Sequence, residues 1–120
     1  MHAEEIQRSL ENLKNASHVI EATALVSSEG FILASVMPDP PGEERIAWLS
    51  AAFMGLAERC SGEMGKGHPK QLFIQAEHGY IVLMEIGDGT CLSVMAAHDA
   101  KPGMILFDMK KTAEEIRLLM

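Results

Sequence analysis

The stretch IAWLSAAFMGLA, residues 46–57, decides how this sequence must fold, because it reads as a helix without a charged face. Only Ser50 among these twelve residues carries a polar side chain. A helix at the surface of a small domain normally presents charged residues to water on the side that faces away from the core. We therefore expect both sides of this helix to be covered, one by the protein's own sheet and the other by a second element.

The composition around this helix is that of one globular domain over residues 1–120. The net charge is −7, from 17 acidic and 10 basic residues, which argues against nucleic acid and anionic membrane as partners because both attract basic patches. No apolar run approaches the roughly 20 residues that a membrane span needs, and the charged N-terminus is unlike a signal peptide. We expect a cytoplasmic protein in which Cys60 and Cys91 are two buried thiols.

Two groups of strands flank the helix. Two β-rich runs, 19–26 and 31–36, surround a Ser-Ser-Glu-Gly turn and predict a hairpin, and prolines 38, 40 and 41 end its second strand. Three further runs, 71–76, 80–86 and 90–97, are separated by Gly-containing tight turns and predict an antiparallel meander.

Three helices complete the predicted fold. The central helix should begin near Glu43 and Glu44 and end by the glycines after residue 61. A helix over 4–16 and a last helix from about Pro102 each show one apolar stripe. The stripe residues are Ile6, Leu10 and Leu13 in the first, and Ile105, Met109, Ala113, Ile116 and Leu119 in the last. The order α-β-β-α-β-β-β-α indicates an α+β fold, a five-stranded antiparallel sheet with helices on both faces.

The first strand of the meander, 71–76, has a hairpin neighbour on one side only. Its sequence, Gln-Leu-Phe-Ile-Gln-Ala, lacks the charge or proline that usually protects a sheet edge. We infer an edge that is open for pairing with another chain. The strand at 31–36 differs, because the proline cluster protects its end.

The central helix leads to the same conclusion. An inward stripe of Ile46, Leu49, Phe53 and Leu56 would leave an apolar outward face of Trp48, Ala51, Ala52, Met54 and Gly55. Monomers seldom expose such a patch, which favours a two-fold dimer through this helix and the open edge. The alternative, in which the terminal helices cover the outward face, stays open. The expected dimer contacts are Trp48, Ala52, Gly55, Gln71, Phe73 and Gln75.

The element order resembles the Roadblock/dynein light chain 7 family, and within it the prokaryotic MglB-like branch of regulators of Ras-like GTPases. The phrases that carry the resemblance are SSEGFILAS, residues 27–35, and GDGTCLSVMAAHDAKPGMILFDMKKTAEEIRLLM, residues 87–120. The resemblance covers about 15–119 and implies a Roadblock/longin-like fold. It also implies a homodimer, or a heterodimer with a paralogue, in which the middle helix and third strand meet across the two-fold axis.

The resemblance further implies a protein that binds a small Ras-like GTPase and changes its turnover by reshaping it, without inserting an arginine. From their positions, we expect Arg45, Met54, Glu58 and Arg59 to face the GTPase. The alternative is a structural adaptor of a motor or signalling complex that leaves GTP hydrolysis unchanged. A ligand-binding sensor is a weaker option, because aromatic residues make up only 5% of the chain.

No motif in the sequence predicts chemistry of its own. The fragment GEMGKGHPK is not a phosphate loop, which would need glycine at Cys60 and serine or threonine at Gly67. The five histidines are scattered without zinc-site spacing, and no serine has a nucleophile-elbow context. Arg8 and Arg117 are interpreted as solvated helix-end charges, whereas Arg45 and Arg59 bracket the central helix, where they could also pair with acidic residues of a partner. We expect no enzyme, no cofactor and no metal.

Overall fold

The structure, a computed structural model, describes residues 2–120. Its elements are α1 (Ala3–Asn15), β1 (Ile20–Val26), β2 (Ile32–Val36), α2 (Pro40–Glu63), β3 (Gln71–Ala76), β4 (Gly79–Gly87), β5 (Thr90–Ala97) and α3 (Pro102–Leu119). This order confirms the α-β-β-α-β-β-β-α arrangement that the sequence predicts.

The five strands form one antiparallel sheet in the order β2-β1-β5-β4-β3. The predicted hairpin and the predicted meander are joined by pairing between β1 and β5, with Ala24 opposite Ser93 and Val26 opposite Cys91. This junction places β1 and β5 in the interior of the sheet. The two edges are therefore β2 and β3, and the expected edge position of β3 is confirmed.

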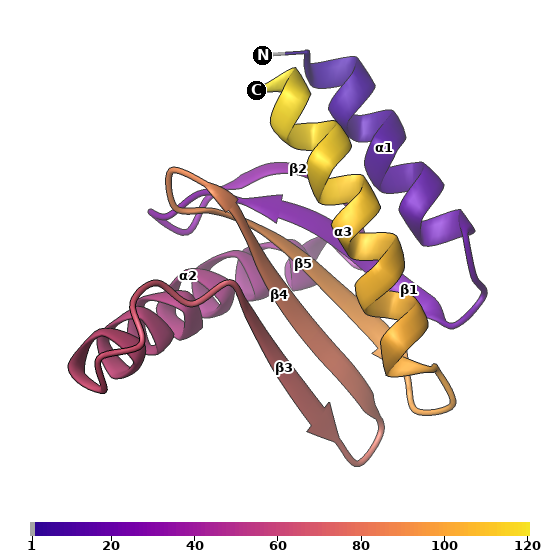
Figure 1. The fold of residues 1–120 in the computed structure, drawn as a ribbon. Helices are drawn as coiled ribbons and strands as arrows, with labels where there is room; N and C mark the ends of the chain where they lie inside the picture. The colour runs from indigo at the N-terminus through magenta and orange to yellow at the C-terminus, as the bar shows by residue number, and fades with distance from the viewer. Residues whose placement is uncertain (1) are drawn as a thin grey trace.

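Helices cover both faces of the sheet, as Figure 1 shows: α1 and α3 lie side by side on one face and α2 lies on the other. The larger core is on the α1–α3 side, where Ile6, Leu10, Ile105, Met109 and Ile116 are fully buried against the strands. The terminal helices thus cannot cover α2. The alternative in which they would cover its outward face is wrong.

The side of α2 that packs on the sheet differs from the prediction. Its buried residues are Ile46, Ala47 and Ser50, whereas Leu49, Phe53 and Leu56 are 37%, 40% and 65% exposed. Small side chains let the helix backbone approach the sheet closely, and Ser50 Oγ lies 2.9 Å from Ser93 Oγ of β5 in a buried hydrogen bond. This contact sets which side of the helix faces inward, so the predicted inward stripe is wrong beyond Ile46.

The start of α2 also differs from the prediction. The helix begins at Pro40, three residues before Glu43. Proline is compatible with the first helical turn, because the N–H groups there have no partner within the helix and the proline ring already holds a helical φ. The proline cluster therefore ends β2 and starts α2 at once.

Candidate interaction site

The outer edge of β3 is one part of the candidate site. Its only strand partner in the described sheet is β4, with Gln71 opposite Met84 and Gln75 opposite Tyr80. Gln71, Phe73 and Gln75 are exposed and share one face of the strand, because they alternate along it. The Phe73 ring packs against Tyr80 with centroids 5.3 Å apart. The unpaired backbone of this edge can accept another strand.

The opposite edge of the sheet is covered. Gln7 of α1 donates from Nε2 to the Ser35 carbonyl oxygen of β2 at 2.8 Å. Ser35 Oγ donates in turn to Glu43 Oε1 at 2.7 Å, which ties β2 to the start of α2. These bonds engage a main-chain acceptor of β2 and place side chains from two helices beside it. A further strand would therefore have to displace them.

The exposed flank of α2 is the second part of the site. Leu49, Phe53 and Leu56 follow one another at spacings of four and three, so they share one side of the helix. Leu49 lines a groove of about 440 Å³ together with Ile81 of β4 and Met95 of β5. We name this side the α2 flank and this hollow the apolar groove.

The α2 flank faces a part of the sheet that the helix leaves open. The main contacts of α2 are with β1, β2 and β5. Ile81 packs beside the buried residues under α2, and its cross-strand partner Ile74 lies on the same face of β3. Both isoleucines are half-buried. The flank, the apolar groove and Ile74 therefore border the same face of the sheet. Gln71, Phe73 and Gln75 lie on the other face, because Val82, the partner of Phe73, belongs to the core under α1 and α3.

A polar cleft lies on the other side of α2. It also measures about 440 Å³, and the turns around Ser28 and Asp88 line it together with Met54 and Glu58 of the helix. His68 Nδ1 pairs with Glu58 Oε1 at 3.2 Å at its exposed rim. Exposed ion pairs of this kind add little to stability.

The two cysteines lie in different environments, which corrects the expectation of two buried thiols. Cys91 lies at the wall of the polar cleft and is 2% exposed. Burial disfavours its thiolate and raises the pKa of Cys91 to about 11, so at neutral pH the thiol is protonated and a poor nucleophile. Cys60 is exposed near the end of α2, because that part of the helix extends past the sheet (Figure 1).

The residues predicted for a dimer fall into two groups. Gln71, Phe73 and Gln75 lie together on β3. Trp48, Ala52 and Gly55 are also exposed, and Trp48 lies beside the β1–β2 turn, with its Cα 3.3 Å from the position that a Cβ on Gly30 would occupy. The α2 flank, which the sequence predicts to face the sheet, is exposed in the structure. The sequence shows the spacing of these apolar residues, but it does not show which side of the helix packs on the sheet.

The residues predicted to face a GTPase do not form one patch. Arg45 lines the apolar groove, whereas Met54 and Glu58 line the polar cleft on the other side of α2. Arg59 is exposed and pairs with Glu63 at 3.6 Å, one helical turn away. A partner that contacts all four residues would have to lie across the outer side of α2.

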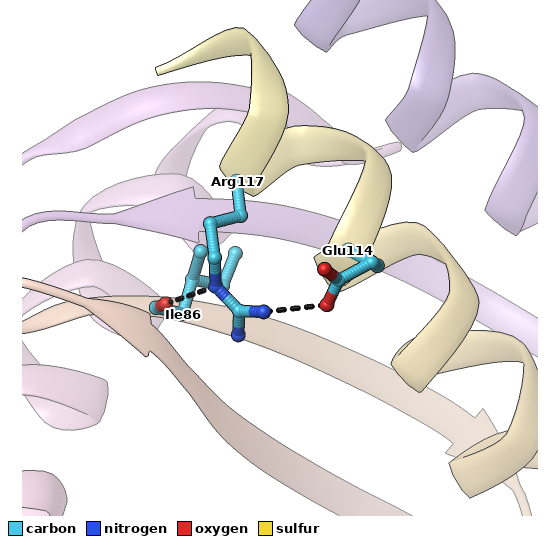
Figure 2. A network of polar contacts seen from close by, with 3 residues as sticks. All are labelled: Ile86, Glu114 and Arg117. Carbon is cyan, nitrogen blue, oxygen red and sulfur yellow. Dashed lines mark hydrogen bonds and ion pairs between the residues drawn. The ribbon is translucent and has the colours of Figure 1, made fainter.

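Arg117 is held by its own domain. Figure 2 shows its Nε donating to the Ile86 carbonyl oxygen of β4, at 2.9 Å, while Nη1 pairs with Glu114 one turn earlier in α3. The side chain thereby fastens the end of α3 to the sheet. This corrects its interpretation as a solvated charge.

Within residues 2–120, no three histidine, cysteine, aspartate or glutamate side chains come together as metal ligands would. None of the helices in this part of the chain is both long and apolar enough to cross a membrane.

Comparison with known proteins gives one family. Residues 2–96 match the Roadblock/LC7 domain. The Methanocaldococcus jannaschii protein MJ1340 is 30% identical over 105 residues, which cover 88% of this chain and 91% of that protein. A Roadblock/LC7 domain from Streptomyces avermitilis superimposes with a TM-score of 0.89 at 19% identity, covering 94% of this chain and 95% of that one. For Myxococcus xanthus MglB the TM-score is 0.91 at 15% identity, and the coverage is 98% and 89%.

Proposed function

This chain belongs to the Roadblock/LC7 domain family, and on that premise we propose that it is a dimeric regulator of a small Ras-like GTPase. It would act by binding and reshaping the GTPase, without chemistry of its own. The observation that carries the proposal is the exposed apolar flank of α2 beside the apolar groove, together with the unpaired edge of β3. The likeness in fold to MglB supports the choice of a GTPase as partner.

The proposed partner in the dimer is a second copy of the chain or a paralogue. Pairing of β3 with its counterpart would satisfy the unpaired main-chain groups of the edge. Leu49, Phe53 and Leu56 would leave water in the same step. Because they are 37%, 40% and 65% exposed, the gain is about 1–2 kcal/mol for Leu56 and about 0.5–1 kcal/mol for each of the other two. We retain Trp48, Ala52, Gly55, Gln71, Phe73 and Gln75 as proposed contacts and add these three residues.

Mass measurement by light scattering tests the dimer. Leu56→Glu places a charge in both symmetry-related halves of the interface and removes an apolar contact from each half. The expected loss is about 3 kcal/mol or more, which is over a hundredfold in the dissociation constant. Arg8→Glu is the matched control, because it introduces the same residue at an exposed site of α1 on the opposite face. A monomeric parent chain, or a Leu56→Glu variant that dimerises like the parent, would refute the dimer.

In the proposed dimer, the outer side of each α2 contributes to the surface that meets the GTPase. Arg45, Met54, Glu58 and Arg59 are the residues we propose there. A regulator of this kind must bind one nucleotide state better than the other, because equal affinity for two states shifts no equilibrium.

The GTPase proposal is tested with a purified small Ras-like GTPase from the same organism, loaded with GDP or with a slowly hydrolysed GTP analogue. We expect tighter binding to one form and a changed single-turnover hydrolysis rate. Arg59→Ala should weaken both effects, while Arg8→Ala should leave them unchanged. Equal binding to both forms with unaltered hydrolysis would instead support the adaptor function, and no binding to either form would refute the GTPase proposal.

A further inference from the structure

A second exposed stripe lies on α3, on the opposite face of the sheet from the α2 flank (Figure 1). Met104, Phe107, Lys111, Glu114 and Leu118 follow one another at spacings of three, four, three and four, and all five are exposed. Phe107 is 66% and Leu118 is 80% exposed. This spacing places all five side chains on one side of the helix, with apolar residues towards the two ends and one charge of each sign between them. We name it the α3 seam.

The α3 seam is separate from the stripe with which the same helix packs on its own domain. Ile105, Met109 and Ile116 fill that inner stripe and are fully buried. The neighbouring helix α1 shows what a solvated outer face looks like here, since Glu4, Arg8 and Glu11 are exposed on it at spacings of four and three. The large apolar residues on the outer face of α3 thus call for a partner.

The order of residues along the α3 seam is self-complementary. If two copies of α3 pack antiparallel about a two-fold axis that passes between Lys111 and Glu114, Phe107 of each copy meets Leu118 of the other. In the same register, Lys111 of each copy meets Glu114 of the other. Two apolar contacts at the ends and two opposite-charge contacts in the middle arise from a single operation. A parallel pair would instead place Lys111 against Lys111 and Glu114 against Glu114.

The carboxylate in this pattern is held in place. Figure 2 shows Glu114 bound through Oε2 to Arg117, which is itself anchored on the Ile86 carbonyl. Fixing the side chain lowers the entropy lost when a second cation binds. The other carboxylate oxygen, Oε1, is available to a second donor.

We propose that the α3 seam is a homotypic docking surface, on which a second copy of this chain packs its own α3 antiparallel. This contact is independent of the β3 edge and lies on the opposite side of the domain. A helix pair of this length covers less than the about 1,200 Å² of standard interfaces. We therefore expect a weak contact, with a dissociation constant of about 100 µM or weaker.

Sedimentation velocity over a concentration series up to the millimolar range tests the proposal. The expected result is a rise of mass above whatever species the β3 edge forms. A monomer, with one seam, should stop at a doubling of mass, whereas a β3-edge dimer, with two seams, should continue to grow with concentration, so either starting species tests the seam. Added salt should weaken the association, because exposed charges are screened.

Charge reversal gives the decisive comparison. Lys111→Glu and Glu114→Lys each replace two attractive contacts by two repulsive ones, so each variant alone should associate about tenfold more weakly. Mixing the two variants restores both contacts, since one chain then carries two glutamates and the other two lysines. Recovery on mixing supports the antiparallel seam, and circular dichroism of each variant checks its fold. Variants that associate like the parent, or a mixture that does not recover, would overturn the proposal.

Cross-linking reports the orientation. In a Cys60→Ser background, a mixture of Phe107→Cys and Leu118→Cys chains should form a disulfide between them. Either variant alone should not, because like positions would lie roughly 16 Å apart along the antiparallel pair, from eleven residues at 1.5 Å each. Cross-linking of Phe107→Cys with itself, or none in the mixture, would refute the antiparallel register.

Discussion

The hydroxyl pair Ser50–Ser93 fixes the face on which α2 sits, and removing one partner should show how strongly. The two oxygens lie 2.9 Å apart between residues that are 0% and 2% exposed. In a Ser50→Ala variant the Ser93 hydroxyl keeps only Cys91 Sγ as a neighbour, at 3.8 Å. A buried hydroxyl without a partner costs about 1–3 kcal/mol, and alanine returns about 0.5 kcal/mol through its helix propensity.

The expected net loss for Ser50→Ala is therefore about 0.5–2.5 kcal/mol, or roughly 2–10 °C in Tm for a domain of this size. Ser93→Ala should cost less, because the Ser50 hydroxyl can bond to the Ile46 carbonyl one turn earlier in its own helix. The double variant should lie close to the parent, since no buried hydroxyl is then left without a partner. The coupling energy between the two sites is expected to be about 1 kcal/mol.

Urea unfolding at one fixed protein concentration measures these values, because self-association would otherwise shift the apparent stability. Ser61→Ala is the matched control, since Ser61 lies on the same helix and is only half-buried. If Ser50→Ala is as stable as Ser61→Ala, or if the two single effects simply add in the double variant, the hydroxyl pair does not hold the helix on this face.

Four further predictions concern the rest of the domain. At pH 8 the exposed Cys60 should react with a thiol reagent in the folded protein, while the buried Cys91 should react only after unfolding. Because burial raises the pKa of Cys91 from 9.0 to about 11, its stabilising contribution is complete below pH 9 and is lost as the pH rises to 11. A Cys91→Ala variant should therefore lose about 1 kcal/mol less than the parent between pH 8 and pH 10 in denaturant titrations. Gly79→Ala should destabilise the protein by several kcal/mol or prevent folding, because φ is +152° and a Cβ would meet a carbonyl oxygen of the neighbouring strand; Gly62→Ala, with nothing within 4 Å, should gain about 0.5–1 kcal/mol. Arg117→Ala should cost about 1 kcal/mol in the same assay, since the half-exposed side chain loses a charge-assisted bond to a strand carbonyl.

The strands and the terminal helices could be predicted because each carries a local signal in the sequence, either a turn residue at its end or apolar residues on one side only. Turn residues such as Gly30 and Gly89 mark the hairpins, and Ile6, Leu10 and Leu13 leave only one side of α1 to bury. The position of β3 at an edge followed from the order of its hairpin neighbours.

The orientation of α2 could not be predicted, because the helix is apolar on every side and periodicity then selects no direction. The deciding contact joins Ser50 to Ser93, two residues 43 positions apart in sequence. Pairing of β1 with β5 is likewise a long-range choice that no local pattern expresses. The candidate site was therefore half predicted, with the edge of β3 found and the α2 flank assigned to the core.

The bond from Gln7 to the Ser35 carbonyl helps to leave the sheet with a single open edge. In the terms of polymer chemistry, the sheet is then a building block with one functional end. A building block with two reactive ends grows into a chain, whereas one with a single reactive end stops when two blocks have joined. Here β3 is the reactive end and β2, capped from α1, is the inert one. Edge-to-edge addition of identical sheets then terminates at a pair, because side chains of α1 and α2 cover the second edge that a cross-β fibre would need.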